Sequence, residues 1–249
     1  MACEMKKVLV LIFIIILFIF YQYGRSIWYP VLVKYTGNKK TVTEVINTLD
    51  DEVSSKLSLL FLTKGIAFPP KKLSLIAFKD SKKLEIWASN IDNNFKLITS
   101  YKIKAASGSL GPKLIEGDRQ VPEGIYKIEG FNPNSSYHLS MKLNYPNTFD
   151  LVHAKNESRA SPGTNIFIHG RSASIGCLAM GDSVIEKLFV LVYKTGLSNT
   201  SVIISPTNPS VNKLEAPIGA PVWVNVLYKN IRNQYDKITK NKTSNPSGI

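Results

Sequence analysis

Short polar turns between strand-like runs constrain the fold of this chain more than any other feature. Residues 73–78, 84–88 and 95–104 are rich in β-branched, aromatic and other apolar residues, and only short polar stretches separate them. A parallel sheet would need crossover helices, and this spacing leaves no room for them. The sequence therefore predicts an antiparallel β-meander. Briefer strands are expected later in the chain, at residues 125–129, 137–143, 165–169 and 201–204.

Helical patterns flank these strands. Thr41 and Glu44 have the spacing of a capping box, and apolar residues recur at helical intervals over 42–62. This helix would pack on the domain or act as a spacer. Two further helices are expected, over residues 183–195 with Asp182 as the N-cap and over residues 221–238. The predicted fold class is therefore mainly β with flanking helices, an α+β domain.

The N-terminus predicts export. Residues 8–20 are uninterruptedly apolar, with Lys6 and Lys7 before them and tyrosines and an arginine after them. A buried core helix is disfavoured because the run is apolar on every face. No small-residue cleavage site follows, which favours a retained anchor over residues 8–24 rather than cleavage and secretion. Everything after about residue 25 would then lie outside the cytoplasm.

Charge and cysteine content exclude several classes of protein. The net charge of +13 suits a polyanionic surface such as anionic lipid or an acidic wall polymer, although a solvated lysine-rich surface explains most of it. Export and the absence of an arginine-rich run argue against nucleic acid. Cys3 and Cys177 cannot build a disulfide scaffold or a four-cysteine zinc site. Separated by the membrane, they would not pair, and no metal or organic cofactor is predicted.

One segment carries candidate chemistry. His169 lies eight residues before Cys177, and Gly176 directly precedes the cysteine. A thiol needs a base or a positive neighbour to act as a nucleophile, and an imidazole supplies the base. Gly176 would let the backbone approach a bound carbonyl, with the Cys177 amide as an oxyanion donor. Spacing alone leaves open a small buried cysteine and an ordinary loop histidine.

The residues around this pair resemble a known family. His169-Gly170 followed by Ser174-x-Gly176-Cys177 is similar to the HG and SxGC motifs of the L,D-transpeptidase catalytic domain, or YkuD, family. Further motifs occur in the order found in its YafK-like branch, so that the resemblance covers about residues 72–205. These motifs are GPKLIEGD at 111–118, VPEGIY at 121–126, NPNSSYHLS at 132–140 and LNYPN at 143–147.

The resemblance implies peptidoglycan chemistry in the periplasm of a Gram-negative bacterium, on a β-sandwich-type catalytic domain. By position, Cys177 is the nucleophile and His169 the base. The Gly170 carbonyl orients the imidazole, the amides of Gly176 and Cys177 hold the oxyanion, and Ser174 shapes the loop.

The implied reaction is acyl transfer. The thiolate attacks the carbonyl of meso-diaminopimelate in a stem tetrapeptide. The terminal D-Ala then departs, and a thioester remains on Cys177. The thioester is then resolved by an amine, which belongs to another stem, to a wall-linked lipoprotein or to a D-amino acid. The alternatives are an L,D-carboxypeptidase, an amidase that cleaves diaminopimelate-linked bonds, and a wall-binding module without catalysis. A general cysteine protease is disfavoured because no papain-like cysteine motif is present.

Other residues have more open roles. Arg171 and Arg159 are candidates for binding a stem-peptide carboxylate, and the alternative for each is a solvated surface charge. His138 is a candidate for a substrate contact, and the alternative is an ordinary strand residue. Ala179 stands where much of the wider family has arginine, which leaves the acceptor open.

Three further positions are expected to do no chemistry. Glu116 and Asp118 are interpreted as structural rather than as a carboxylate pair. His153 is interpreted as an exposed histidine in a polar loop over 150–161, a loop that is also a candidate flap over the site.

These interpretations divide the chain into four parts. They are an anchor (1–25), a helical juxtamembrane region (26–71), the catalytic domain (72–205), and a C-terminal helix with a disordered tail (206–249).

Overall fold

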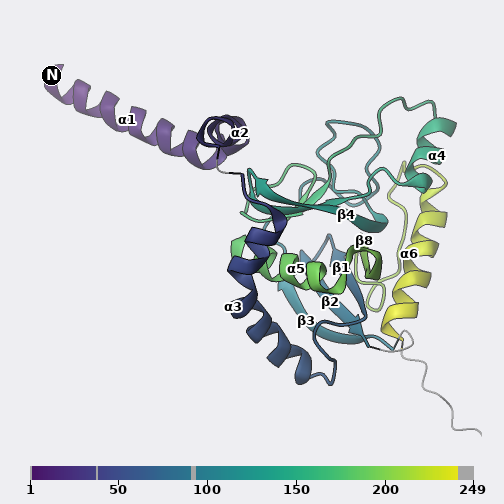
Figure 1. Cartoon of the computed structure of the whole chain (residues 1–249). Coiled ribbons are helices and arrows are strands. Elements are labelled where there is room, and N and C mark those ends of the chain that lie inside the picture. Colours follow the sequence, from purple (N-terminus) through teal and green to yellow (C-terminus); the bar gives the residue numbers. More distant parts are fainter. Residues whose placement is uncertain (1, 38, 91–93, 241–249) are drawn as a thin grey trace, which may run out of the picture.

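The computed structural model describes residues 2–37, 39–90 and 94–240. Its centre is one eight-stranded sheet in the order β3-β2-β1-β8-β4-β5-β6-β7 (Figure 1). The strands are β1 (Lys72–Phe78), β2 (Lys83–Ser89), β3 (Lys96–Lys102), β4 (Gly124–Ser135), β5 (His138–Leu143), β6 (Phe167–His169), β7 (Leu178–Ala179) and β8 (Thr200–Ser205).

The predicted meander is confirmed. β1 pairs antiparallel with β2, from Lys72 opposite Ser89 to Phe78 opposite Lys83, and β2 pairs antiparallel with β3. The whole sheet is mixed, because β8 lies parallel to β1 and β7 lies parallel to β6. β8 can run parallel to β1 because a long connection, which includes a helix, separates the two strands in sequence.

Helices α3 (Val42–Leu62) and α5 (Asp182–Thr195) cover one face of the sheet (Figure 1). The predicted capping box is formed: the Glu44 amide donates to Thr41 Oγ1 at 3.2 Å, and the Thr41 amide donates to Glu44 Oε2 at 2.6 Å. Side chains of α3 are buried in the same core as the strands, so α3 packs on the domain and is not a spacer. They are Val45, Ile46, Val53, Leu57 and Phe61.

The opposite face is covered by α6 (Val224–Thr239) (Figure 1). Alternation along β1 explains the two layers, because Leu75 and Ala77 join the core beneath α3 and α5, whereas Ile76 and Phe78 pack in the α6 cluster. The predicted fold class, mainly β with flanking helices, is confirmed.

Two local predictions were wrong. Asp182 does not cap its helix: the N-cap is Gly181, and the Asp182 carboxylate accepts the Arg171 amide at 2.7 Å. The polar stretch that holds His153 contains a helix, α4 (Thr148–Asn156), because Asn147 and Asp150 form a second capping box. This helix has little apolar periodicity, which is why the pattern did not indicate it.

The N-terminal helices α1 (Ala2–Tyr23) and α2 (Arg25–Thr36) extend away from the sheet (Figure 1). Within the described residues, no helix has both the length and the apolar character needed to cross a membrane. The anchor over residues 8–24 stays a prediction. The side chain of Cys3 and the tail from residue 241 onward lie outside the described residues.

Candidate active site

Cys177 and His169 line one cavity of about 190 Å³ at the β7 end of the sheet. His169 is the last residue of β6, which pairs with β5 through Ser140 and with β7 through Ala179. Because β7 starts directly after Cys177 and lies beside β6, the connecting loop returns the cysteine to the strand that carries the histidine. The other lining residues are Asn132, Ser135, Ser136, Tyr137, Ser140 and Phe167.

The His169 ring is buried and held in one tautomer. Its Nδ1 lies 2.6 Å from the carbonyl oxygen of Gly170, and a carbonyl only accepts hydrogen bonds, so Nδ1 carries the proton. Nε2 is therefore unprotonated in the neutral ring, as a general base must be. The Tyr137 ring packs against the imidazole with centroids 4.6 Å apart. Burial lowers the pKa of His169 below its usual value, and the bond to Gly170 opposes this shift only in part.

The Cys177 thiol is unpaired and half-buried. Its Sγ lies 3.8 Å from the carbonyl oxygen of Asn165. Burial raises the pKa of this thiol above its usual value, while a backbone hydrogen bond from Phe167 and the positive charge of Lys113 oppose the increase. A raised thiol pKa and a lowered imidazole pKa both favour the neutral forms, so the resting pair is a thiol and an imidazole.

Serine hydroxyls hold the loop that presents the cysteine. The Gly176 amide donates to Ser107 Oγ at 2.6 Å, and the Cys177 amide donates to Ser174 Oγ at 3.0 Å. Ser174 Oγ donates in turn to the Cys177 carbonyl at 2.6 Å, which closes the turn. Both amides predicted for the oxyanion are therefore occupied by hydroxyls in this structure. Sequence reasoning missed Ser107 because it lies 69 positions before Gly176.

Close packing surrounds the backbone beside His169. A Cβ at Gly170 would lie 2.6 Å from the Tyr137 carbonyl oxygen and 2.8 Å from Asp182 Oδ1, so this position requires glycine. Arg171 follows in the left-handed region at φ +59, and its Nε lies 3.8 Å from Asp182 Oδ2. Arg171 thus adjoins the site without lining the cavity.

The other two predicted substrate contacts lie elsewhere. Arg159 donates to Glu157 Oε2 at 2.7 Å and to the Leu114 carbonyl at 2.6 Å, and it faces a separate groove. His138 Nε2 lies 2.7 Å from Glu186 Oε1.

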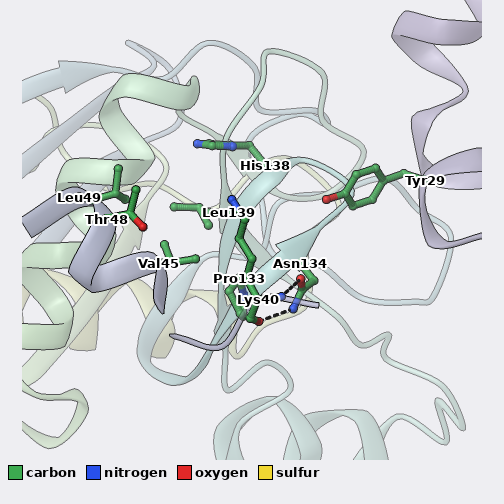
Figure 2. A pocket seen from close by; sticks show the side chains of 9 residues that line it. All are labelled: Tyr29, Lys40, Val45, Thr48, Leu49, Pro133, Asn134, His138 and Leu139. Carbon is green, nitrogen blue, oxygen red and sulfur yellow. Dashed lines mark hydrogen bonds between the residues drawn. The ribbon is translucent and has the colours of Figure 1, made fainter. Parts of the chain in front are cut away.

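His138 lines a second pocket of about 130 Å³, between the start of α3 and the β4–β5 hairpin (Figure 2). Figure 2 also shows the two hydrogen bonds that join Lys40 to Asn134 at this pocket, at 2.9 and 2.7 Å. The structure therefore does not bring Arg159 and His138 to the cysteine cavity.

The predicted flap packs against another part of the domain. The His153 ring stacks on Trp223, just before α6, with centroids 4.6 Å apart, and it also contacts Phe149 on α4. Trp223 Nε1 donates to Glu157 Oε1 at 2.6 Å. These contacts hold α4 against the start of α6.

Glu116 and Asp118 have the structural roles expected of them. Glu116 Oε2 accepts the Thr164 amide at 2.9 Å. Asp118 accepts the amides of Leu114, Ile115 and Gln120 at 2.9 to 3.1 Å, and its Oδ1 also pairs with the Lys113 ammonium. Among the described residues, no cluster of His, Cys, Asp and Glu could hold a metal ion.

Comparison with known proteins decides the family. A model of the L,D-transpeptidase catalytic domain (YkuD) matches residues 80–224, more than half of the chain. The chain belongs to this family. The predicted family is thus confirmed, and membership supports a role in modifying peptidoglycan.

Relatives of known sequence match part of the chain. The proteins named "Putative L,D-transpeptidase YafK" from Escherichia coli K12 and O157:H7 are 34% identical to it over 117 residues, which are 46% of this chain and 45% of theirs. The chain thus spans about half the length of these curated relatives.

Solved structures also resemble part of the chain. The helical cell shape determining protein Pgp2 from Campylobacter jejuni is 24% identical with a TM-score of 0.46, over 55% of this chain and 48% of that one. L,D-transpeptidase 1 from Mycobacterium tuberculosis is 11% identical with a TM-score of 0.31, over 53% and 61%.

Proposed function

We propose that this protein is a peptidoglycan L,D-transpeptidase that forms an acyl-thioester on Cys177, with His169 as the base. The observation that carries the proposal is the 2.6 Å hydrogen bond from His169 Nδ1 to the Gly170 carbonyl. It leaves Nε2 free to accept a proton in the cavity that His169 shares with the cysteine. The family match supports the same substrate class.

Acylation follows from the neutral resting pair. His169 Nε2 takes the thiol proton as Sγ attacks the carbonyl of meso-diaminopimelate at position three of a stem tetrapeptide. The tetrahedral intermediate collapses, and the bond between this carbonyl carbon and the nitrogen of the terminal D-Ala breaks. The imidazolium returns its proton to the departing amine, which leaves a thioester on Cys177 and a neutral His169.

The proposal assigns the oxyanion to the amides of Gly176 and Cys177. Both now donate to the hydroxyls of Ser107 and Ser174, at 2.6 and 3.0 Å. In the proposed reaction the oxyanion accepts from these amides alongside the hydroxyls, which stay in place and hold the loop. Amides that already point at an oxygen need little reorganisation when charge develops on the substrate.

An amine then resolves the thioester. We propose the amine of a second stem as the acceptor, giving a 3-3 crosslink, with a wall-linked lipoprotein or a free D-amino acid as the other amines. Arg171 remains the candidate for a stem carboxylate, since it adjoins the site and its buried Nε makes no hydrogen bond. The substrate contacts of Arg159 and His138 stay predictions. Because peptidoglycan lies there, we place the reaction in the periplasm.

The test is to incubate the full-length protein with tetrapeptide muropeptides and to identify the products by mass spectrometry. Cys177→Ala is the inactive control, and Cys3→Ala is the matched control that should keep full activity. Dimers linked 3-3 with loss of D-Ala support the proposal.

Two other outcomes would change it. Tripeptides alone would make water the acceptor and the protein an L,D-carboxypeptidase. If wild type and Cys177→Ala both leave tetrapeptides, crosslinked sacculi and lipoprotein-bearing sacculi unchanged, the proposed chemistry is wrong and a wall-binding module is favoured.

A further inference from the structure

A lysine outside the predicted site packs against the segment that contacts the nucleophile. Lys113 belongs to the GPKLIEGD turn, and its side chain is only 4% exposed. An ammonium is buried in proteins only when its charge is paired and its protons are hydrogen-bonded. Its Nζ donates to the Ile115 carbonyl at 2.8 Å and to Asp118 Oδ1 at 2.5 Å. The lysine therefore occupies one fixed position.

Packing places this ammonium against one end of the segment that contacts the cysteine. Gly163 is so close that a Cβ there would lie 2.5 Å from Lys113 Cε and 3.2 Å from Nζ. Two residues further on, the Asn165 carbonyl contacts Cys177 Sγ at 3.8 Å. Lys113 and Cys177 thus contact opposite ends of the same three-residue segment.

The surrounding turn holds this segment rigidly. The Glu116 amide donates to the Ser161 carbonyl at 3.0 Å, and Glu116 Oε2 accepts the Thr164 amide at 2.9 Å. Tyr145 Oη donates to the carbonyls of Lys113 and Pro162, at 3.2 and 2.8 Å. Hydrogen bonds therefore join the turn that carries Lys113 to the stretch that contains the segment.

We propose that Lys113 is a positioning residue for the reaction: its buried ammonium, fixed by Asp118, stabilises the negative charge that develops on Cys177 Sγ. This inference rests on the proposed function. Burial disfavours the thiolate, and a nearby opposite charge offsets that penalty. Of the charged side chains near the thiol, Lys113 is the one whose field lowers the pKa of Cys177.

Other charged or titratable groups also surround this arrangement. His169 faces the thiol from β6, and its burial favours the neutral ring. Asp118 pairs with the ammonium in its own turn, and Glu116 Oε2 accepts the Thr164 amide within the segment that contacts the thiol. Tyr145 is neutral because burial raises the pKa of its hydroxyl, and Arg159 reaches the turn at the Leu114 carbonyl.

The test measures the thiol without any peptidoglycan. In full-length protein carrying Cys3→Ser, the rate of Cys177 alkylation by iodoacetamide is followed against pH by intact-protein mass spectrometry. Lys113→Met should raise the midpoint of this profile by about one pH unit, and Lys113→Arg should keep it near wild type. Lys104→Met, which removes an exposed lysine charge, is the matched control and should leave the midpoint unchanged.

A second variant tests the sign of the effect. Asp118→Asn removes the carboxylate that partly neutralises the ammonium, so the midpoint should fall. A purely structural role for the turn predicts no change or a rise. The proposal is overturned if Lys113→Met leaves the midpoint unchanged. If Lys113→Met does not fold, Asp118→Asn decides instead, and the proposal is overturned when its midpoint stays at or above that of wild type. Because alkylation needs no muropeptide, this result stays separate from the test of transpeptidation.

Discussion

Strands β3, β2, β1 and β8 form one end of the sheet, where neighbouring strands share six or seven residue pairs. At the other end, β6 has three residues and β7 has two. We refer to these as the scaffold end and the cysteine end. The β4–β5 ladder at the cysteine end also shifts register twice. The β2–β3 ladder shifts once, so the pairing at the cysteine end is less regular, and its strands β6 and β7 are shorter.

Backbone conformation differs in the same way. His138, Asn165 and Arg171, around the cysteine end, are non-glycine residues with positive φ, at +75, +57 and +59. Each such residue costs on the order of 1 to 3 kcal/mol unless its surroundings compensate. At the scaffold end only Lys82, in the β1–β2 turn, has this conformation among the described residues. The comparison teaches that long ladders and two buried faces stabilise the domain while short strands let loops converge on Cys177.

The largest expected effect is at the cysteine end. His169→Asn removes the base but leaves a polar side chain, so kcat should fall about 10²- to 10⁴-fold while the far-UV circular dichroism spectrum is kept. Muropeptide turnover measures it. Activity within tenfold of wild type would show that His169 is not the base. The catalytic role assigned to the cysteine end would then be wrong.

The matching change at the scaffold end should affect stability alone. Phe78 is fully buried and lies edge-on to Tyr235 with centroids 6.2 Å apart. Phe78→Ala should lower the free energy of unfolding by about 3 to 5 kcal/mol, because it leaves a cavity beneath α6. Urea unfolding measures the loss, and the activity per folded molecule should stay unchanged. A parallel loss of kcat would mean that the two ends are not separable.

A buried carboxylate between the two ends makes stability depend on pH. Burial raises the pKa of Asp150 from 3.8 to about 6, so the folded state holds its proton more tightly than the unfolded state. Its contribution is full below pH 3.8 and is lost as pH rises through about 6. Asp150→Asn keeps an acceptor for the helix cap and removes this loss, which is on the order of 3 kcal/mol.

The measurement is the difference in unfolding free energy between Asp150→Asn and wild type, taken below and above this range. The variant should gain stability relative to wild type as pH rises. If this difference does not change with pH, the pKa of Asp150 is not raised in the folded state.

The smallest effect concerns the loop that holds the cysteine. Ser107 Oγ accepts the Gly176 amide at 2.6 Å and donates to the Arg119 carbonyl at 2.7 Å. Ser107→Ala should lower kcat several-fold, since each such bond contributes about 1 kcal/mol to the position of the loop. Ser109→Ala, an exposed neighbour, is the control. Equal kinetics in the two variants would show that the loop holds its position without Ser107.

The resemblance to a known family, carried by motifs in a fixed order, brought much of the site within reach. The pair His169 and Cys177, the Gly170 carbonyl and the turn-forming Ser174 were all predicted, and the structure gathers them around one loop. Lys113 was visible only as part of a motif with no assigned role. Ser107 had no signal at all, because its partners lie at distant positions in the chain.

The amino-acid sequence by itself determined the features that depend on near neighbours. These include the capping box at Thr41 and the β1–β2–β3 meander. Only the tertiary structure decided that β8 lies parallel to β1, that α3 joins the main core and that Lys113 lies beside the thiol's segment. The reason is physical: periodicity and turn chemistry act over a few residues, whereas burial and charge pairing depend on which distant segments share one interior.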